Sequence, residues 1–380
     1  MDILKYTLEH DEFRGRLKTF LAKEVTPKVD QWEKDHIVPR KAWLKFGKAG
    51  FLCTSISPEY GGIGGDFLYS IIVAQELSYT VHSGLAAGLH SDVVVPYIDA
   101  FGSKQQKAKY LPGCVSGKII TAIAMTEPDA GSDLSAMTTT AIEDGDNVII
   151  NGSKTFISNG INCDLVVLAA SDPAVKNKHQ AISLYLLEAD TPGFKRGKQL
   201  DKMGWNSQDT AELFFSDCCI PKANRLGDPG SGFLQLMTKL QQERLVCAMG
   251  AVFAAERIME FIIEYCKTTM INGKPLTRSQ AVRFAIVEMT TQVKLGKTFM
   301  EKLCVDHMEG KNIVIETSMA KQWTTDMVNE IAERSMDLCE ESALLETNPI
   351  ARAKRDVRVM SIFAGTNEIM KGIAAKFMGL

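Results

Sequence analysis

The spacing of apolar residues changes twice along this chain of 380 residues, and that change constrains the fold more than any other feature. Between Phe13 and Val25 apolar side chains recur at helical spacing. From about Lys118 to Pro221 the pattern becomes short β-branched or aromatic runs separated by turn signals. After Gly232 the helical period returns and continues to the end. This order is typical of separate helical and β regions, not of alternating βαβ units.

The order predicts an α+β protein with an N-terminal helical domain at 1–118, a middle antiparallel β domain at 119–228 and a C-terminal four-helix bundle at 229–380. Strands are expected at 119–124, 147–151, 165–170, 181–187 and 211–215. Long helical segments are expected at 233–267, 279–309, 315–345 and 348–361. Their short links favour an antiparallel bundle.

Charge and composition exclude several classes of protein. Lys plus Arg number 43 against 46 Asp plus Glu, a net charge of −3, so nucleic acid is not expected as the main partner. The apolar runs are far shorter than the roughly 18 residues that cross a bilayer, and no signal peptide is visible. Nine scattered cysteines indicate a reducing, cytoplasmic location. The six histidines lack metal-ligand spacing, so no metal site is expected.

Three segments carry candidate binding chemistry. The first, Ala124-Met-Thr-Glu-Pro-Asp-Ala-Gly-Ser-Asp133, follows a predicted strand, and its loop could present backbone N–H groups to a ligand. The second, Asn151-Gly-Ser-Lys-Thr-Phe-Ile-Ser-Asn-Gly160, places an aromatic ring among hydroxyls, where it could lie along a flat heterocycle. The third, Phe363-Ala-Gly-Thr-Asn-Glu-Ile369, interrupts the last helices with a turn. Taken singly, each is also explained by a solvated turn or hairpin.

Taken together and in this order, the segments resemble the acyl-CoA dehydrogenase family over nearly the whole chain, most closely its long-chain and bacterial branch. Further stretches carry the resemblance: Pro58-Glu-Tyr-Gly-Gly, Leu89-His-Ser-Asp, Phe101-Gly-Ser-Lys-Gln-Gln-Lys, Leu200-Asp-Lys-Met-Gly, Ser207-Gln-Asp-Thr-Ala-Glu-Leu-Phe-Phe, Gln242-Glu-Arg-Leu and Gly365-Thr-Asn-Glu-Ile-Met-Lys. The resemblance implies an acyl-CoA dehydrogenase-like fold, an FAD cofactor and an oligomer, usually a homotetramer. It also implies an acyl-CoA substrate that becomes an enoyl-CoA, and an electron-transfer flavoprotein as acceptor.

The resemblance also assigns site residues by motif. Met125 and Thr126 correspond to the segment that contacts the pyrimidine edge of the flavin, and Phe156, Ile157 and Ser158 to the stretch along its face. The other implied contacts are Gln280, Thr366 and Glu368 for the cofactor, and Ser132 and Arg244 for the substrate.

The family has two positions for the carboxylate base. The position before Gly-Thr in the terminal turn is Ala364, which cannot act as a base, and the other position is Glu243. Glu243 is therefore the expected base, against the alternative of a solvated helix carboxylate. Asp92 is a second candidate, as in relatives that act on alicyclic carboxyl-CoA substrates, or it is only a helix N-cap.

Two departures from the family pattern concern the ADP half of the flavin site. Thr269 and Asn272 stand where the family has an arginine and an aromatic. Asp337, Glu340 and Glu341 replace a glutamine and two glycines. Nearby carboxylates would repel a pyrophosphate. The chain is thus expected to be a homo-oligomer with altered ADP recognition or one subunit of a hetero-oligomeric dehydrogenase. A third possibility is an acyl-CoA-binding relative without flavin.

Overall fold

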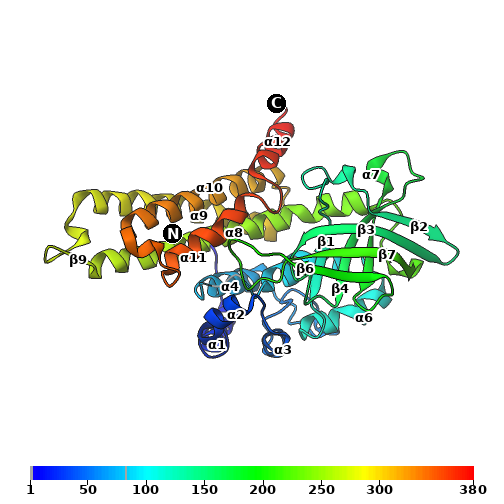
Figure 1. The fold of residues 1–380 in the computed structure, drawn as a ribbon, viewed down its shortest axis with the longest axis horizontal. Coiled ribbons are helices and arrows are strands. Elements are labelled where there is room, and N and C mark those ends of the chain that lie inside the picture. The colour runs from blue at the N-terminus through cyan, green and yellow to red at the C-terminus, as the bar shows by residue number, and fades with distance from the viewer. Residues whose placement is uncertain (1–2, 82–83) are drawn as a thin grey trace.

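The computed structural model describes residues 3–81 and 84–380 as an elongated molecule with a β sheet at one end and long helices at the other (Figure 1). The first helices are α1 (Leu8–Glu24), α2 (Val29–Asp35), α3 (Arg40–Lys48), α4 (Phe67–Ser78), α5 (Val95–Phe101) and α6 (Lys104–Val115). Their inward faces bury Phe13, Trp43 and Phe46 in one hydrophobic core. The predicted helical character of this region is confirmed.

A π-helical turn, Leu89–Val94, leads directly into α5. Its residues from His90 to Val94 are buried. Such turns insert one extra residue into the helical ladder and so rotate the following side chains. Here the turn carries Asp92 into the interior, beside α4 and the long helix α8 (Gly232–Thr268).

The middle region is an eight-stranded sheet with the order β6-β7-β3-β2-β4-β5-β8, and β1 pairs with β4. The strands are β1 (Thr121–Ala124), β2 (Thr140–Asp144), β3 (Asn147–Ile157), β4 (Leu165–Ser171), β5 (Ile182–Glu188), β6 (Phe194–Gln199), β7 (Ala211–Pro221) and β8 (Arg225–Leu226), with the short helix α7 (Lys178–Ala181) before β5. All five predicted strands are present, whereas β2, β6 and β8 were not predicted. Most side chains of β2 and β6 are polar and exposed or only half-buried, and β8 has only two residues.

The expectation of a purely antiparallel sheet is wrong for two strand pairs, β1 with β4 and β2 with β4. Thr121–Ala124 runs parallel to β4, with Thr121 opposite Leu165. A parallel pair needs a crossover connection, and the β2–β3 hairpin lies between the two strands in the sequence. Strand β2 is also parallel to β4, where Thr140 lies opposite Ser171. The remaining strand pairs of this sheet, among the described residues, are antiparallel.

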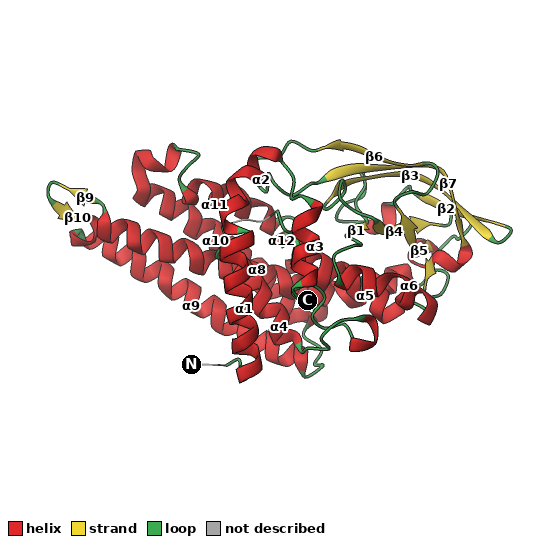
Figure 2. Cartoon of the chain, turned by 90° about the horizontal axis from the view of Figure 1, so that it is seen from below, coloured by secondary structure: helices red, strands yellow, loops and turns green. Residues whose placement is uncertain are grey.

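Strand β4 is buried on both faces, which explains its continuous apolar run. Leu165, Val167 and Ala169 pack into the core shared with the N-terminal helices. Val166 and Leu168 face the opposite side and pack into a core of their own sheet. The β region and the N-terminal helices are thus joined through one face of the sheet (Figure 2).

The C-terminal region consists of α8, α9 (Gln280–Met308), α10 (Val314–Cys339), α11 (Pro349–Val357) and α12 (Asn367–Phe377), with a small hairpin of β9 (Met270–Ile271) and β10 (Lys274–Pro275) between α8 and α9. Helix α10 ends at Cys339, not at 345 as predicted, because Glu340 has a φ of +48° that a helix cannot continue through. The segment predicted as one helix at 348–361 is α11 followed by a 3-10 turn at Arg358–Ser361. Figure 1 shows α8 extending from this bundle to the β sheet.

Candidate active site

Helix α8 places Glu243 in the interior, where its side chain is only 6% exposed. The Tyr97 hydroxyl, on α5, donates a hydrogen bond of 2.7 Å to Glu243 Oε1. Burial raises the pKa of Glu243 to about 7, against the lowering effects of the Tyr97 hydrogen bond and the Arg244 charge. The alternative of a solvated helix carboxylate is wrong. A carboxyl group with this pKa is suited to accept a proton near neutral pH.

Asp92 is a second buried carboxylate close to the same stretch of α8. Its Oδ1 accepts a hydrogen bond of 2.6 Å from the Ser70 hydroxyl on α4, and its backbone oxygen accepts one of 2.7 Å from Gln242 Nε2. Burial raises the pKa of Asp92 to about 6, partly offset by the Ser70 hydrogen bond. Asp92 lies inside the π-helical turn, so the N-cap alternative is wrong. The fold therefore brings both candidate bases to the segment around Gln242.

Arg244 follows Glu243 and is also buried, with 5% of its surface exposed. Its Nε has no hydrogen-bond partner among the described residues. Burial lowers the pKa of Arg244, against the raising effects of Glu243 and Tyr97. An unpartnered guanidinium N–H in the interior is costly unless a ligand supplies an acceptor. Arg244 is thus placed as a ligand-binding residue would be.

The two segments expected along the flavin ring are adjacent. Thr126, just after β1, accepts a hydrogen bond of 2.9 Å at its backbone oxygen from the Thr155 N–H on β3. The register of β3 against β7 shifts between Lys154 and Ile157. Within this irregularity Phe156 has a φ of +57° and its side chain is 68% exposed. The bulge turns the aromatic ring out of the sheet and leaves it exposed.

Met125 and Ser158, which lie next to Thr126 and near Phe156 in the sequence, are half-buried. Ile157 is buried and packs into the hydrophobic core of the sheet. Ile157 therefore contributes to the core and only its backbone is available to a ligand. Ser132 is exposed in the loop after β1.

A buried ion pair that the sequence analysis missed supports this loop. Lys154 Nζ lies 2.8 Å from Glu127 Oε1 and donates to the Met125 backbone oxygen at 3.0 Å. Glu127 also accepts hydrogen bonds from the N–H groups of Thr138 and Thr139. The signal available in the sequence was a lysine at an inward position of a strand, which needs a partner.

The terminal turn joins the 3-10 turn after α11 to α12. Phe363 contacts Trp205 edge to face, with ring centroids 5.5 Å apart. Ala364 and Gly365 both have positive φ values, +55° and +91°. The Thr366 hydroxyl then caps α12 by accepting from the Ile369 N–H. Glu368 is exposed in the first turn of α12.

The remaining expected cofactor residue, Gln280, is not near the ring-binding segments. It is exposed at the start of α9, next to the hairpin of β9 and β10. Figure 1 shows this hairpin at the end of the bundle that lies away from the sheet. Thr269 immediately precedes β9 and shares this location. One chain therefore does not bring Gln280 or Thr269 together with Phe156.

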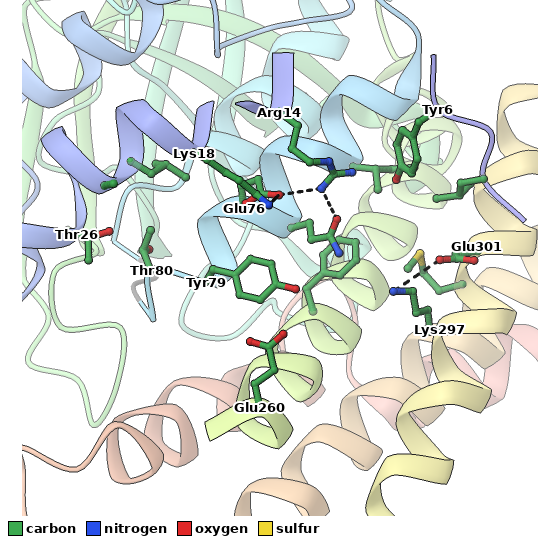
Figure 3. Close-up of a pocket in the computed structure, with 17 residues that line it drawn as sticks. Tyr6, Arg14, Lys18, Thr26, Glu76, Tyr79, Thr80, Glu260, Lys297 and Glu301 are labelled. Carbon is green, nitrogen blue, oxygen red and sulfur yellow. Dashed lines mark hydrogen bonds and ion pairs between the residues drawn. The ribbon is translucent and has the colours of Figure 1, made fainter. Parts of the chain in front are cut away.

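A cavity of about 770 Å³ lies elsewhere, between α1, α4, α8 and α9 (Figure 3). Its charged residues are mostly paired with one another. Arg14 lies 2.8 Å from Glu76, and Lys297 lies 4.0 Å from Glu301. None of the residues predicted for catalysis or cofactor binding lines this cavity. Because its charges already neutralise each other, the cavity shows no preference for a charged ligand.

Comparison with known proteins agrees with this arrangement. Sequence profiles of the acyl-CoA dehydrogenase N-terminal, middle and C-terminal domains match residues 7–118, 122–218 and 230–379. The long-chain specific acyl-CoA dehydrogenase of Rattus norvegicus is 40% identical over 373 residues, covering 98% of this chain and 86% of that protein. A crystal structure of acyl-CoA dehydrogenase from Geobacillus kaustophilus has a TM-score of 0.97 and 48% identity, covering 99% of each chain. The butyryl-CoA dehydrogenase of Megasphaera elsdenii has a TM-score of 0.94 at 29% identity, covering 99% of this chain and 100% of that one.

Proposed function

The chain belongs to the acyl-CoA dehydrogenase family of flavoprotein oxidoreductases acting on CH–CH bonds, and we propose that it uses FAD. In this proposal Glu243 is the base that removes the α proton of the substrate. The observation that carries the proposal is the buried Glu243 carboxylate, hydrogen-bonded at 2.7 Å to Tyr97. Its pKa of about 7 matches the need of a general base at neutral pH.

In the proposed reaction the Cα–H bond of an acyl-CoA thioester breaks and its proton passes to Glu243. The Cβ–H bond breaks with its electron pair, and a Cα=Cβ double bond forms. When bound, FAD supplies the acceptor for this hydride at N5 of the flavin. Donors near the thioester oxygen stabilise the negative charge that develops there. The burial of Glu243 limits the access of water and strengthens these interactions.

The residues present fit the ring half of FAD. Phe156 offers an exposed aromatic face beside Thr126, and a flavin ring would cover it. The Nε–H of Arg244 is buried and has no partner among residues 3–81 and 84–380, and an oxygen of the acyl-CoA would satisfy it. Thr126 and Ser158 would supply polar contacts at the edge of the ring, and Thr366 and Glu368 would contact the cofactor from the start of α12.

The ADP half fits less well, and this favours a second candidate assembly. Glu340 and Glu341 are exposed at the end of α10, and Thr269 lacks the charge of the arginine that the family pattern has there. Glu340 keeps a φ of +48°, a conformation that suits glycine. These segments would face a flavin held by a neighbouring subunit. The chain is therefore either a homotetramer with weakened ADP contacts or one subunit of a hetero-oligomer whose partner supplies them.

A second candidate reaction uses Asp92 as the base. Its carboxyl group is buried, has a pKa of about 6 and lies against the helix that carries Glu243. This arrangement would suit an alicyclic carboxyl-CoA whose acidic carbon lies at a different position from that of a linear acyl chain.

An electron-transfer flavoprotein is the proposed acceptor in either case. No helix of the described residues is long and apolar enough to cross a membrane.

The experiment that tests the proposal measures the flavin content of the purified native oligomer and its reduction by acyl-CoA. We expect a yellow protein whose flavin absorbance is bleached anaerobically by a linear acyl-CoA. Bleaching only by an alicyclic carboxyl-CoA would support the Asp92 reaction. A colourless protein that binds acyl-CoA and gains no activity when FAD is added would overturn the proposal in favour of a binding protein. A ratio of one flavin per two chains, with a second type of subunit present, would support the hetero-oligomer.

A further inference from the structure

Lys321, on α10, is a buried cation that none of the assigned roles explains. Its side chain is 0% exposed. Its Nζ donates to the Gly365 backbone oxygen at 2.7 Å and to Asn367 Oδ1 at 3.1 Å. No carboxylate among the described residues lies within ion-pair distance of it. Burying an ammonium group without a counter-ion is costly, so the two acceptors on the terminal turn must compensate for it.

Helix α10 also holds the turn through a second set of contacts, made by Asn367. Asn367 Nδ2 donates to Asp326 Oδ1 at 2.7 Å and to Thr325 Oγ1 at 3.0 Å. The Thr325 hydroxyl is also within 3.1 Å of Asn367 Oδ1. The turn is therefore fixed to α10 at two points, the backbone of Gly365 and the side chain of Asn367.

The backbone of the turn needs such support. Ala364 and Gly365 have φ values of +55° and +91°, and the first is unfavourable for a residue with a Cβ atom. The C=O of Gly365 and the N–H of Thr366 belong to one trans peptide unit, so they point in opposite directions. Because the C=O points at Lys321, the Thr366 N–H points away from α10. The lysine thus sets the direction in which the start of α12 offers its polar groups.

The position of Lys321 links this turn to the base. Burial lowers the pKa of Lys321, and the charges near it include those of Asp326 and Arg244. Cys247 is also close to Lys321, but burial raises the pKa of its thiol to about 12 and keeps it neutral. Cys247 and Arg244 are on α8, one turn from each other and beside Glu243. Lys321 therefore reaches from α10 to the terminal turn, near the part of α8 that carries Arg244.

From these contacts we propose that Lys321 is a positioning residue that holds the terminal turn in the orientation needed to bind the cofactor. It does not touch the reacting atoms. The long apolar stem of lysine crosses the core and delivers several donors to one point, which a shorter side chain cannot do. The effect on FAD binding rests on the proposed FAD site. The contact of Lys321 with the terminal turn does not, because it lies within the chain.

The matched variants are Lys321→Met, which keeps the length of the side chain without the charge, and Lys376→Met, which changes an exposed lysine on α12. Amide hydrogen exchange of the segment 363–370 is measured in the chain as purified, and FAD affinity is measured by flavin fluorescence. For Lys321→Met we expect exchange of this segment to become at least about tenfold faster and FAD affinity to fall by about 10- to 100-fold, as for loss of a charge-assisted hydrogen bond. Lys376→Met should change neither quantity.

A merely structural role is distinguished by chemical rescue. In Lys321→Ala, propylammonium should restore slow exchange and FAD affinity, whereas butanol, which is neutral, should not. Equal rescue by both would mean that Lys321 only fills space, and it would overturn the proposal. Unchanged exchange and unchanged affinity in Lys321→Met would also overturn it. If Lys321→Met does not fold, Lys321→Gln, which is polar but shorter, takes its place with the same expected changes.

The proposed function can fail separately. If the wild-type chain binds no FAD under any condition, the FAD site is wrong, but hydrogen exchange at 363–370 still decides whether Lys321 holds the turn. If the wild type binds FAD and Lys321→Met binds it equally well, only the inference about Lys321 is wrong.

Discussion

The Tyr97 hydroxyl on α5 donates a 2.7 Å hydrogen bond to Oε1 of Glu243 on α8, and the two residues are 146 positions apart in the sequence. The bond fixes the direction of the carboxylate while leaving Oε2 to accept a proton. It also stabilises the charged form and so limits the rise in pKa that burial causes. Tyr97 is itself buried, and burial raises the pKa of its own hydroxyl well above the usual value, so it stays a donor across the working pH range.

Replacing the base should abolish turnover without removing the ligands. Glu243→Gln keeps the shape of the side chain but cannot take a proton. We expect turnover to fall by roughly 10²- to 10⁴-fold or more, which is the usual effect of losing a general base. Flavin content and acyl-CoA binding should be retained, and stopped-flow reduction of the flavin measures the change.

Asp92→Asn is the matched control for that substitution, because it also neutralises a buried carboxylate near Gln242. If Glu243 is the base, Asp92→Asn should retain much more activity than Glu243→Gln on linear acyl-CoA. The reverse result, an inactive Asp92→Asn and an active Glu243→Gln, would reassign the base to Asp92.

The pH dependence follows from the same pair. A base must be deprotonated, so kcat/KM should rise with pH and level off above the pKa of Glu243, about 7. Tyr97→Phe removes a hydrogen bond that favours the charged form. Its midpoint should therefore move to higher pH. A midpoint that stays in place or moves to lower pH in Tyr97→Phe would contradict the role given to this hydrogen bond.

His90 should make the protein sensitive to acid. Its Nδ1 accepts from the Thr121 N–H at 3.2 Å and its Nε2 donates to the Cys114 backbone oxygen at 3.0 Å, so the ring is held neutral. Burial lowers the pKa of His90 to about 4, against the raising effects of the hydrogen bond to the Cys114 backbone and of the Asp164 charge. The unfolded chain has a His pKa of about 6.5.

Because the folded pKa is the lower one, the contribution of His90 is fully present above pH 6.5 and is lost as the pH falls towards 4. The loss should reach about 3 kcal/mol in the free energy of unfolding. Urea unfolding of the wild type and His90→Gln at several pH values measures it. The buried carboxylates affect both proteins equally, so the difference between the two should shrink in acid. A difference that does not depend on pH would contradict the assignment.

Restoring the family pattern in the ADP half should strengthen flavin binding. Thr269→Arg adds a cation, and Glu340→Gly with Glu341→Gly removes two carboxylates. Together these changes should raise FAD affinity by roughly 30- to 1000-fold. Equilibrium dialysis of the homo-oligomer provides the measurement. A wild-type homo-oligomer that already holds one FAD tightly per chain would show that the ADP half is not weakened.

Glu340 provides a separate prediction about stability. Its φ of +48° and ψ of −133° lie in a region that favours glycine and that costs other residues about 1–3 kcal/mol. Glu340→Gly removes this strain, but glycine loses more conformational entropy on folding, which offsets part of the gain. The free energy of unfolding should therefore rise by about 1 kcal/mol. Glu341→Gly is the control, because Glu341 has no positive φ and gains nothing from glycine. Equal effects of the two substitutions would show that the backbone of Glu340 is not strained.

Much of the fold could be predicted from the sequence, because the relevant signals are local. The periods of 3.6 and 2 separated the helices from the strands, and the strand at 165–170 was found because both of its faces are buried. Strands β2 and β6 were missed since they bury few side chains and so carry no period. The parallel pairing of β1 with β4 joins residues about 44 positions apart, and no local pattern encodes it.

Some features of the candidate site could also be predicted from the sequence, and others could not. The order of helical and β regions and the motifs that identify the family can be read from the chain alone, because these depend on neighbouring residues. Three contacts form only when the chain folds: Glu243 is buried against Tyr97, Asp92 contacts Ser70, and Lys321 reaches the terminal turn. Each of these is a contact between distant segments, and each removes a charged group from water. Burial and the nearest hydrogen-bond partner set the pKa and the ligand-binding capacity of such a group, and both come into being only when the helices pack.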